Sequence, residues 1–251
     1  RLLICLTILH AGFLRAQEIS LVPQPTQVAP QKGVFKLDGK TRIICSPQSQ
    51  AEASWLKSHL ASVTGVDMAI STGKRARKNA IQLTIDPSLD MKTDEGYTLT
   101  VKASGVQIQA TGAAGIFYGI QTLRQMLPAD GSAQAIPCVE ITDEPSYPWR
   151  AMMLDVSRYF FDKDYVKRYL DIMASHKLNV LHLHLVDDPG WRVQISKYPK
   201  LTEVGGFRGT GANRYGGYYT QDDIREFVEY AAKLHIDIVP EIELPAHIQS
   251  A

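Results

Sequence analysis

The sequence contains little cysteine. Its 251 residues include three cysteines, Cys5, Cys45 and Cys138, which is too few for a small scaffold held together by disulfides. No cysteines and histidines have the spacing of a structural zinc site, so we predict no metal. Cys45 and Cys138 could pair in an oxidising compartment, but their spacing does not demand it. We favour two buried free thiols.

The sequence also has almost no net charge, with 27 basic and 26 acidic residues. Such a balance gives no overall field that would attract nucleic acid or an anionic membrane, and we predict neither as a partner. One basic cluster is present, at Lys74-Arg75-Ala76-Arg77-Lys78. It lies among Gly and Ser and contains no aromatic residue, so we interpret it as a solvated loop.

Long apolar runs are absent except for one, from Leu2 to Leu14. This run is too short to span a bilayer as a helix, so we predict no membrane span. A preceding Arg1 and a following Ala16 are typical of a signal peptide, and we predict that residues 1–16 are its remnant. The protein is then exported, to the periplasm or the medium. An apolar first strand of the fold is the alternative.

Residues 17–147 have the pattern of a small α/β domain. Short β-type runs are predicted at 33–37, 42–44, 80–85, 97–101 and 106–110. The last two are joined by a hairpin turn, and helical spacing predicts helices over 51–63 and from Ile116 to Leu127, ahead of Pro128. Polar and apolar residues alternate in the strands, so we expect one sheet face to meet water and the other to carry the helices. A linker is then predicted at Pro137, Pro145 and Pro148.

Residues 148–251 alternate between buried strands and helices. Strands are predicted at 151–156, 180–186 and 236–242, and helices at 166–174 and after a capping box of Thr220 and Asp223. This alternation is the signature of parallel βα architecture. A TIM barrel needs eight such units and about three fit here, so the predicted fold is α/β: a small sheet domain followed by the start of a truncated (β/α)8 barrel. A small open sheet is the alternative.

Polar residues follow the carboxyl end of each predicted barrel strand. They are Asp155 and Arg158, then Asp187, then His247. A βα barrel builds its active site at this end. An arginine beside a carboxylate suits recognition of hydroxyls or an anion, and a histidine paired with a carboxylate can control the protonation of a second carboxylic acid. A structural Asp155–Arg158 pair and a histidine that only packs would explain the same residues.

Two further patterns in this half could suggest ligand sites, but we do not interpret them so. Alternation places His182 and His184 on one face of a strand, but two histidines make an incomplete zinc site, and we favour histidines that pack in the barrel. Glycine pairs at 205–206 and 216–217 lie among aromatic residues, without the strand–glycine–helix context of a dinucleotide site. They predict a flexible loop at the barrel mouth.

Taken in order, these motifs resemble the start of the catalytic barrel of glycoside hydrolase family 20, the β-N-acetylhexosaminidases. The matching segments are 148–150 (Pro-Trp-Arg), 154–158 (Leu-Asp-Val-Ser-Arg), 182–188 (His-Leu-His-Leu-Val-Asp-Asp), 190–192 (Gly-Trp-Arg), 218–220 (Tyr-Tyr-Thr) and 240–247. The preceding domain resembles the small α/β partner of that family, most clearly at 95–97 and 115–119.

The resemblance implies an exo-acting enzyme that removes terminal β-linked N-acetylglucosamine or N-acetylgalactosamine from glycans or chito-oligosaccharides. Arg158 matches the family arginine that binds sugar hydroxyls. Asp187 matches the aspartate that supports His247, and His247 matches the histidine linked to the acid/base glutamate. In this family the acetamido oxygen of the substrate attacks the anomeric carbon with retention, so the resemblance implies no cofactor.

This sequence departs from the family pattern in two ways. The adjacent Asp-Glu pair of the family belongs after the fourth barrel strand, whereas Asp94-Glu95 and Asp143-Glu144 both lie in the small domain. We therefore expect these 251 residues to be inactive alone. Ala246 stands where the family usually has glycine. A non-catalytic carbohydrate-binding relative, and a barrel of another glycosidase class, are the alternatives.

Overall fold

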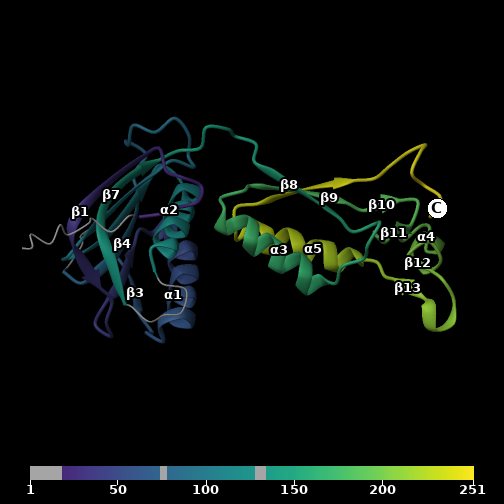
Figure 1. Ribbon diagram of the computed structural model, residues 1–251, viewed down its shortest axis with the longest axis horizontal. Coiled ribbons are helices and arrows are strands. Elements are labelled where there is room, and N and C mark those ends of the chain that lie inside the picture. Colours follow the sequence, from purple (N-terminus) through teal and green to yellow (C-terminus); the bar gives the residue numbers. More distant parts are fainter. Residues whose placement is uncertain (1–18, 74–77, 128–133) are drawn as a thin grey trace, which may run out of the picture.

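A computed structural model describes residues 19–73, 78–127 and 134–251, which form two units side by side (Figure 1). The predicted leader at 1–16 and residues 74–77 of the basic cluster lie outside the described residues. No helix among the described residues is long and apolar enough to cross a membrane. Cys45 and Cys138 are buried and unpaired, which confirms the prediction of free thiols.

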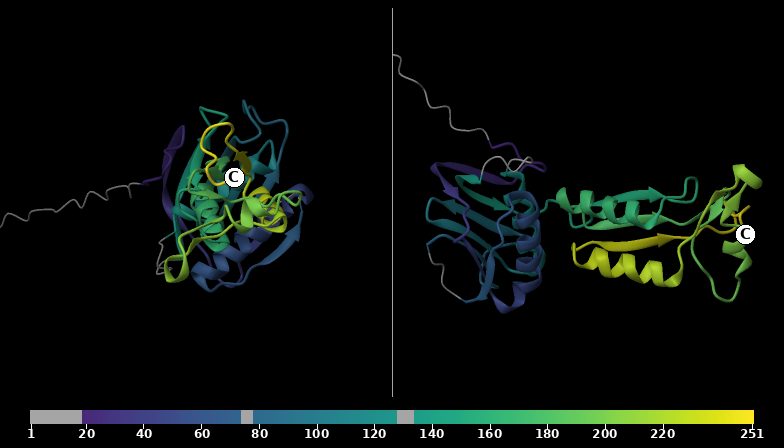
Figure 2. Two further views of the ribbon diagram at one scale, coloured as in Figure 1. Left: turned by 90° about the vertical axis from the view of Figure 1, so that its right-hand side faces the viewer. Right: turned by 90° about the horizontal axis from the view of Figure 1, so that it is seen from below.

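The first unit, called the sheet unit here, is a seven-stranded mixed sheet with the order β1-β7-β5-β6-β4-β2-β3. Its strands are β1 (Gln27–Lys36), β2 (Arg42–Cys45), β3 (Ala69–Thr72), β4 (Ala80–Ile85), β5 (Tyr97–Lys102), β6 (Gly105–Ala110) and β7 (Ala135–Asp143). The helices α1 (Gln50–Thr64) and α2 (Ala113–Gln125) cover one face, as Figures 1 and 2 show. This arrangement confirms the predicted small α/β unit.

Apolar side chains on one face of the strands pack this sheet against its helices. Leu99 of β5 lies opposite Ile108 of β6 in the predicted hairpin, and both are fully buried. Gly119 of α2 permits close approach, because a Cβ there would lie 2.6 Å from Ile108 Cγ2. The helix therefore packs directly onto the hairpin.

The linker prediction is wrong at Pro137, which lies within β7. Strand β5 pairs with β7 only as far as Val139, so at Pro137 the remaining neighbour is β1. The register of β1 shifts beside it, between Pro30 and Val34. Proline has no N–H for the hydrogen-bond ladder of a sheet, so its presence in the sequence suggested a break. It is tolerated in β7 because prolines fit at sheet edges and bulges. Strand β3, an edge strand, was also not predicted.

The second unit, called the parallel unit, contains a three-stranded parallel sheet with the order β14-β9-β8. Its strands are β8 (Ala151–Asp155), β9 (Val180–His184) and β14 (Asp237–Glu241), and its main helices are α3 (Lys163–Ser175) and α5 (Gln221–Ala232). The Thr220–Asp223 capping box that begins α5 is confirmed. Two short hairpins, β10–β11 (Val186–Asp187, Gly190–Trp191) and β12–β13 (Phe207–Arg208, Tyr215–Gly216), and the short helix α4 (Lys200–Glu203) complete the unit.

The two faces of the parallel sheet differ. Leu181 and Leu183 are buried in the core that includes residues of α3 and α5. On the opposite face, Met153, His182 and Val239 form a row across the three strands, and Met153 is 54% exposed. Two exposed apolar side chains, Met153 and Val239, thus lie on either side of a histidine on this face.

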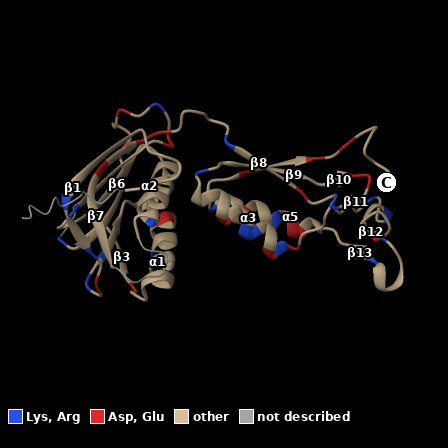
Figure 3. Cartoon of the chain, viewed as in Figure 1, with Lys and Arg blue, Asp and Glu red and all other residues tan. Residues whose placement is uncertain are grey.

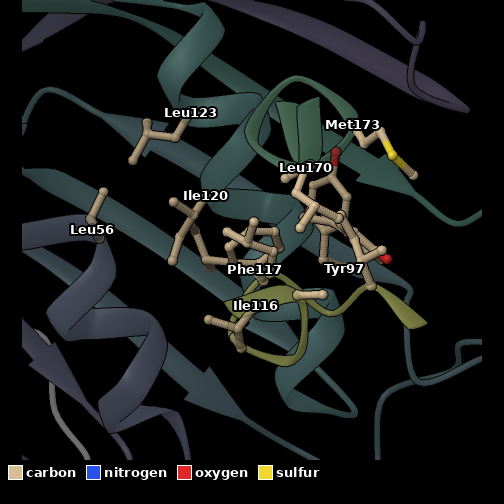
Figure 4. Close-up of a cluster of buried hydrophobic side chains, with 14 of the residues drawn as sticks. Leu56, Tyr97, Ile116, Phe117, Ile120, Leu123, Leu170 and Met173 are labelled. Atoms are coloured by element: carbon tan, nitrogen blue, oxygen red, sulfur yellow. The ribbon is translucent and has the colours of Figure 1, made fainter. Parts of the chain in front are cut away.

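The two units share one hydrophobic core. Leu170 and Met173 of α3 belong to the same cluster as Tyr97 of β5 and Phe117 of α2 (Figure 4). This contact closes the amino-terminal end of the parallel sheet, the end that supports stability in barrel folds.

Buried polar contacts reinforce this junction. The Lys177 ammonium donates to Asp143 Oδ2 and to the Tyr97 hydroxyl, both at 2.8 Å, and Lys177 is 6% exposed. Arg150 pairs with Glu95 at 2.8 Å. All three anionic or phenolic partners lie in the sheet unit, so charge pairing as well as apolar contact joins the two units.

Candidate active site at the strand ends

Charged side chains from three strands meet at the carboxyl end of the parallel sheet. Asp155, His184 and Glu241 are the last residues of β8, β9 and β14, and the strand register places them in one row. Figure 3 shows acidic residues in red where β14 ends, at the end of the unit farthest from the sheet unit. The site therefore lies opposite the junction.

Arg158 is held by two carboxylates. Its Nη1 lies 2.6 Å from Asp155 Oδ2, and its Nη2 lies 2.5 Å from Asp187 Oδ2. Burial tends to raise the pKa of Asp155, but hydrogen bonds from the backbone and side chain of Arg158 outweigh it and lower that pKa. The Arg158 side chain is still 55% exposed. A fixed, accessible guanidinium suits recognition of hydroxyl groups or of an anion.

Asp187 is the most buried carboxylate of the site, with 3% of its side chain exposed. Its Oδ1 accepts the Asp188 N–H at 2.6 Å and lies 3.3 Å from His247 Nδ1. Its Oδ2 faces Arg158 and His184. Burial tends to raise the pKa of Asp187, but these hydrogen bonds and nearby charges outweigh it and lower that pKa. Asp187 is therefore a carboxylate that touches both other predicted site residues.

His247 follows β14 in a turn and has a half-exposed side chain. Its φ of 57° lies in the left-handed region, which is costly for a residue other than glycine. The preceding Ala246 does not have a positive φ, so its backbone does not need the glycine that the family usually has there. The structure thus brings Arg158, Asp187 and His247 together as the sequence predicts.

His182 and His184 do more than pack. His182 Nε2 and His184 Nδ1 each lie 2.6 Å from Glu241 Oε2, and the Glu241 carboxylate raises the pKa of Glu243. The set His184, Glu241 and Glu243 has donor atoms close enough for a cation. The set Asp187, Asp188 and His247 has the same property. Glu241 already contacts His182 and His184, and Asp187 already pairs with Arg158, so we assign no metal to either set.

The second strand ends earlier than predicted. Strand β9 ends at His184, and Val186 and Asp187 belong to the β10–β11 hairpin. The hairpin turns Asp187 back toward the sheet, which is how one carboxylate can reach both Arg158 and His247. The alternation of apolar residues with His182 and His184, followed by Leu185 and Val186, concealed this break.

The loop at the site is packed rather than open, contrary to the flexible loop that its glycines predicted. Arg192 is 2% exposed and donates to four backbone carbonyls, those of Val156, Ser157, Gly206 and Gly217. The glycines allow this crowding. A Cβ at Gly190 would lie 2.2 Å from Arg192 Cζ, and one at Gly217 would lie 2.4 Å from Phe160 Cε1.

Gly216 gives a direct test of that packing. Its φ is +137°, and a Cβ there would lie 2.2 Å from the Gly206 carbonyl oxygen. We expect Gly216→Ala to destabilise the protein by about 2–4 kcal/mol, since backbone strain of about 1–3 kcal/mol is added to a clash. Urea denaturation measures the change.

The matched control is Gly211→Ala in the same loop. Gly211 also has a positive φ, of +57°, but a Cβ there meets nothing within 4 Å. We expect a loss of only about 1–2 kcal/mol, the cost of left-handed backbone alone. Equal losses for the two variants would contradict a closely packed loop.

Two family models match the chain. The model described as glycosyl hydrolase family 20, domain 2, matches residues 18–144. The model described as glycosyl hydrolase family 20, catalytic domain, matches residues 147–251. Together they take in both the sheet unit and the parallel unit.

Individual proteins agree with these matches. A beta-hexosaminidase of Porphyromonas gingivalis is 39% identical over 242 residues, which cover 93% of this chain and 31% of that protein. One of Vibrio furnissii is 33% identical, with 94% and 39% covered. A solved structure, a mutant Streptomyces plicatus beta-hexosaminidase in complex with product (GlcNAc), has a TM-score of 0.84 and 38% identity over 92% of this chain and 47% of that one.

The fold, the charged cluster at the strand ends and these similarities place the chain among the glycoside hydrolases. Within that class, it belongs to glycosyl hydrolase family 20. The chain spans about a third to a half of the length of the relatives it matches.

Proposed function

We propose that the whole protein is an exo-β-N-acetylhexosaminidase that releases terminal, non-reducing β-linked N-acetylhexosamine from glycans or chito-oligosaccharides. The observation that carries this proposal is Asp187, which joins Arg158 and His247 at the strand ends of a family 20 chain. Relatives named beta-hexosaminidase and N,N'-diacetylchitobiase support it, as does a Vibrio harveyi exo beta-N-acetylglucosaminidase solved in complex with N-acetylglucosamine.

The three parallel strands are proposed to be the first three of a (β/α)8 barrel. In the described part of the chain, β8 and β14 each pair on one side only. The exposed row of Met153, His182 and Val239 lies where further strands would cover it. We also propose a boundary at 147/148 between the small domain, from residue 17, and the barrel.

The proposed chemistry assigns one role to each residue. Arg158 retains exposed N–H groups beyond its two ion pairs, and these would bind hydroxyls of the terminal sugar. Asp187 accepts a hydrogen bond from the His247 Nδ1–H, which leaves His247 Nε2 to face the acid/base carboxyl. The acetamido oxygen of the substrate attacks the anomeric carbon while that acid protonates the leaving oxygen, so no enzyme carboxylate forms a covalent bond.

The acid/base glutamate and its neighbouring aspartate are proposed to lie outside residues 1–251. Three of the four residues in the two Asp-Glu pairs of this chain have other partners. Glu95 pairs with Arg150, Asp143 with Lys177 and Glu144 with Lys92. These pairings belong to the junction or the sheet unit and not to the strand ends, so the 251 residues alone should not hydrolyse substrate.

The first experiment is to sequence the encoding DNA beyond codon 251 and to express the complete reading frame. We expect an adjacent Asp-Glu pair after the next buried strand. We also expect release of para-nitrophenol from its N-acetyl-β-glucosaminide but not from the matched β-glucoside, which lacks the acetamide. A complete barrel without that pair, or binding of chito-oligosaccharide without hydrolysis, would instead identify a carbohydrate-binding relative.

Export is proposed from the apolar run Leu2–Leu14. Its test is fractionation of the source cells, with amino-terminal sequencing of the mature protein. A mature start near residue 17 in the periplasm or medium is expected. Protein that retains the apolar run in the cytoplasm would contradict export.

A further inference from the structure

A buried histidine lies beneath the three site residues and has no role in the mechanism above. His184 ends β9, and 6% of its side chain is exposed. Its Nε2 lies 3.2 Å from Asp187 Oδ2, and its Nδ1 lies 2.6 Å from Glu241 Oε2. The imidazole is therefore enclosed between a carboxylate of the site and a carboxylate of the neighbouring strand.

This geometry favours the protonated form of the ring. A neutral imidazole has one N–H and one lone pair, whereas the protonated ring has two N–H groups. His184 Nδ1 lies 2.6 Å from Glu241 Oε2, the same oxygen that His182 Nε2 approaches at 2.6 Å. Only the protonated ring presents a positive N–H to both carboxylates.

The Asp187 carboxylate needs such a partner. Arg158 and His184 occupy Oδ2, and the Asp188 N–H and His247 occupy Oδ1. The side chains of Arg158 and His247 are 55% and 53% exposed, whereas that of His184 is buried. Of the three side chains, His184 is the one that is shielded from solvent.

We propose that His184 is a positioning residue, whose imidazole fixes the Asp187 carboxylate so that Oδ1 accepts from His247 Nδ1 and thereby sets the tautomer of His247. The predicted effect on catalysis rests on the proposed function. The predicted effect on the His247 tautomer does not depend on that function. His184 acts through Asp187 and touches no substrate.

The charges around His184 favour the protonated ring. Burial lowers the pKa of His184, but the carboxylates of Glu241, Asp187 and Asp155 outweigh it and raise that pKa. The other titratable or charged groups that contact these carboxylates or adjoin them are His182, Asp188, Glu243, His247 and Arg158. A histidine with a raised pKa keeps its ion pairs below that pKa and loses them as the pH rises through it. The hold on Asp187 therefore extends to higher pH than an ordinary histidine would allow.

The test compares His184→Gln with His182→Gln in the full-length protein. His182 is the matched control, because it lies on the same face of β9 and contacts the same Glu241 oxygen, yet it has no contact with Asp187. Histidine-selective ¹⁵N NMR reads the ring nitrogens directly. In the unmodified protein at pH 7 we expect both nitrogens of His184 to be protonated and neutral His247 to carry its proton on Nδ1.

In His184→Gln we expect His247 to become a mixture of tautomers and kcat to fall about 100-fold, with KM changed by less than about 3-fold. His182→Gln should leave the His247 tautomer unchanged.

A singly protonated His184 in the unmodified protein would overturn the proposal without any variant. So would an unchanged His247 tautomer in His184→Gln, or the same change in His182→Gln. If the unmodified protein hydrolyses no N-acetylhexosaminide, the proposed function fails, and the NMR result still decides this inference.

Discussion

In the full-length protein, Asp187→Asn is expected to lower kcat for an aryl N-acetyl-β-glucosaminide by about 1,000-fold or more. A buried aspartate that orients a histidine typically contributes about 10⁴-fold when its replacement by asparagine imposes the wrong tautomer. The asparagine amide would direct N–H groups where Asp187 now accepts from Arg158, His184 and His247. Steady-state kinetics measures the loss.

The control for this variant is the neighbouring residue. Asp188 also carries a carboxylate at the site, but the one hydrogen bond recorded for its side chain is that accepted from the Gln249 N–H, and an asparagine can keep it. Asp188→Asn should therefore retain activity within about 10-fold. If Asp187→Asn and Asp188→Asn lose activity equally while both remain folded, Asp187 does not have the assigned role.

The second large effect is expected at the junction. Lys177→Met should destabilise the protein by about 3–5 kcal/mol, because it leaves the buried Asp143 carboxylate without its cation. Methionine keeps the apolar stem and the Cβ at a φ of 59°, so the backbone cost is unchanged. Urea denaturation, followed by fluorescence, gives the change in the free energy of unfolding.

Two further variants identify the cause of that loss. Adding Asp143→Asn to Lys177→Met removes the unpaired charge but keeps an oxygen acceptor for Tyr97, and it should recover at least half of the loss. Lys163→Met removes a lysine that pairs with Asp223 at 2.7 Å but is 45% exposed, and should cost less than about 1 kcal/mol. A double variant as unstable as Lys177→Met would show that packing, and not charge, is responsible.

Much of the fold could be predicted because its signals are local. The 97–110 hairpin has alternating residues with a short turn, and the Thr220–Asp223 capping box marks the start of α5 directly. Pro137 was misread because a proline is tolerated in β7 only through its position beside a register shift in β1. That partner lies about a hundred residues earlier, and no local pattern records it.

In the candidate site, too, some residues could be predicted from local sequence patterns and others could not. Arg158, Asp187 and His247 were found because each follows a strand, and strand ends converge in a parallel sheet. The role of Arg192 was missed, since its partners are backbone carbonyls, which every residue has. His184 was taken for a packing residue because its partner Glu241 comes from a strand whose register only the fold defines.

The pairing of β1 with β7 also bears on how the chain is made. The first and last strands of the sheet unit are neighbours, with Gln27 opposite Thr142, so the sheet is complete only when residue 142 has left the ribosome. Strand β8 begins at Ala151, almost immediately afterwards. Since domains generally fold as units during synthesis, amino-terminal first, the sheet unit can form before the parallel unit has been synthesised completely. Nascent β8 and β9 then meet a preformed surface that carries Glu95 and Asp143, and their amino-terminal ends have ionic partners from the outset.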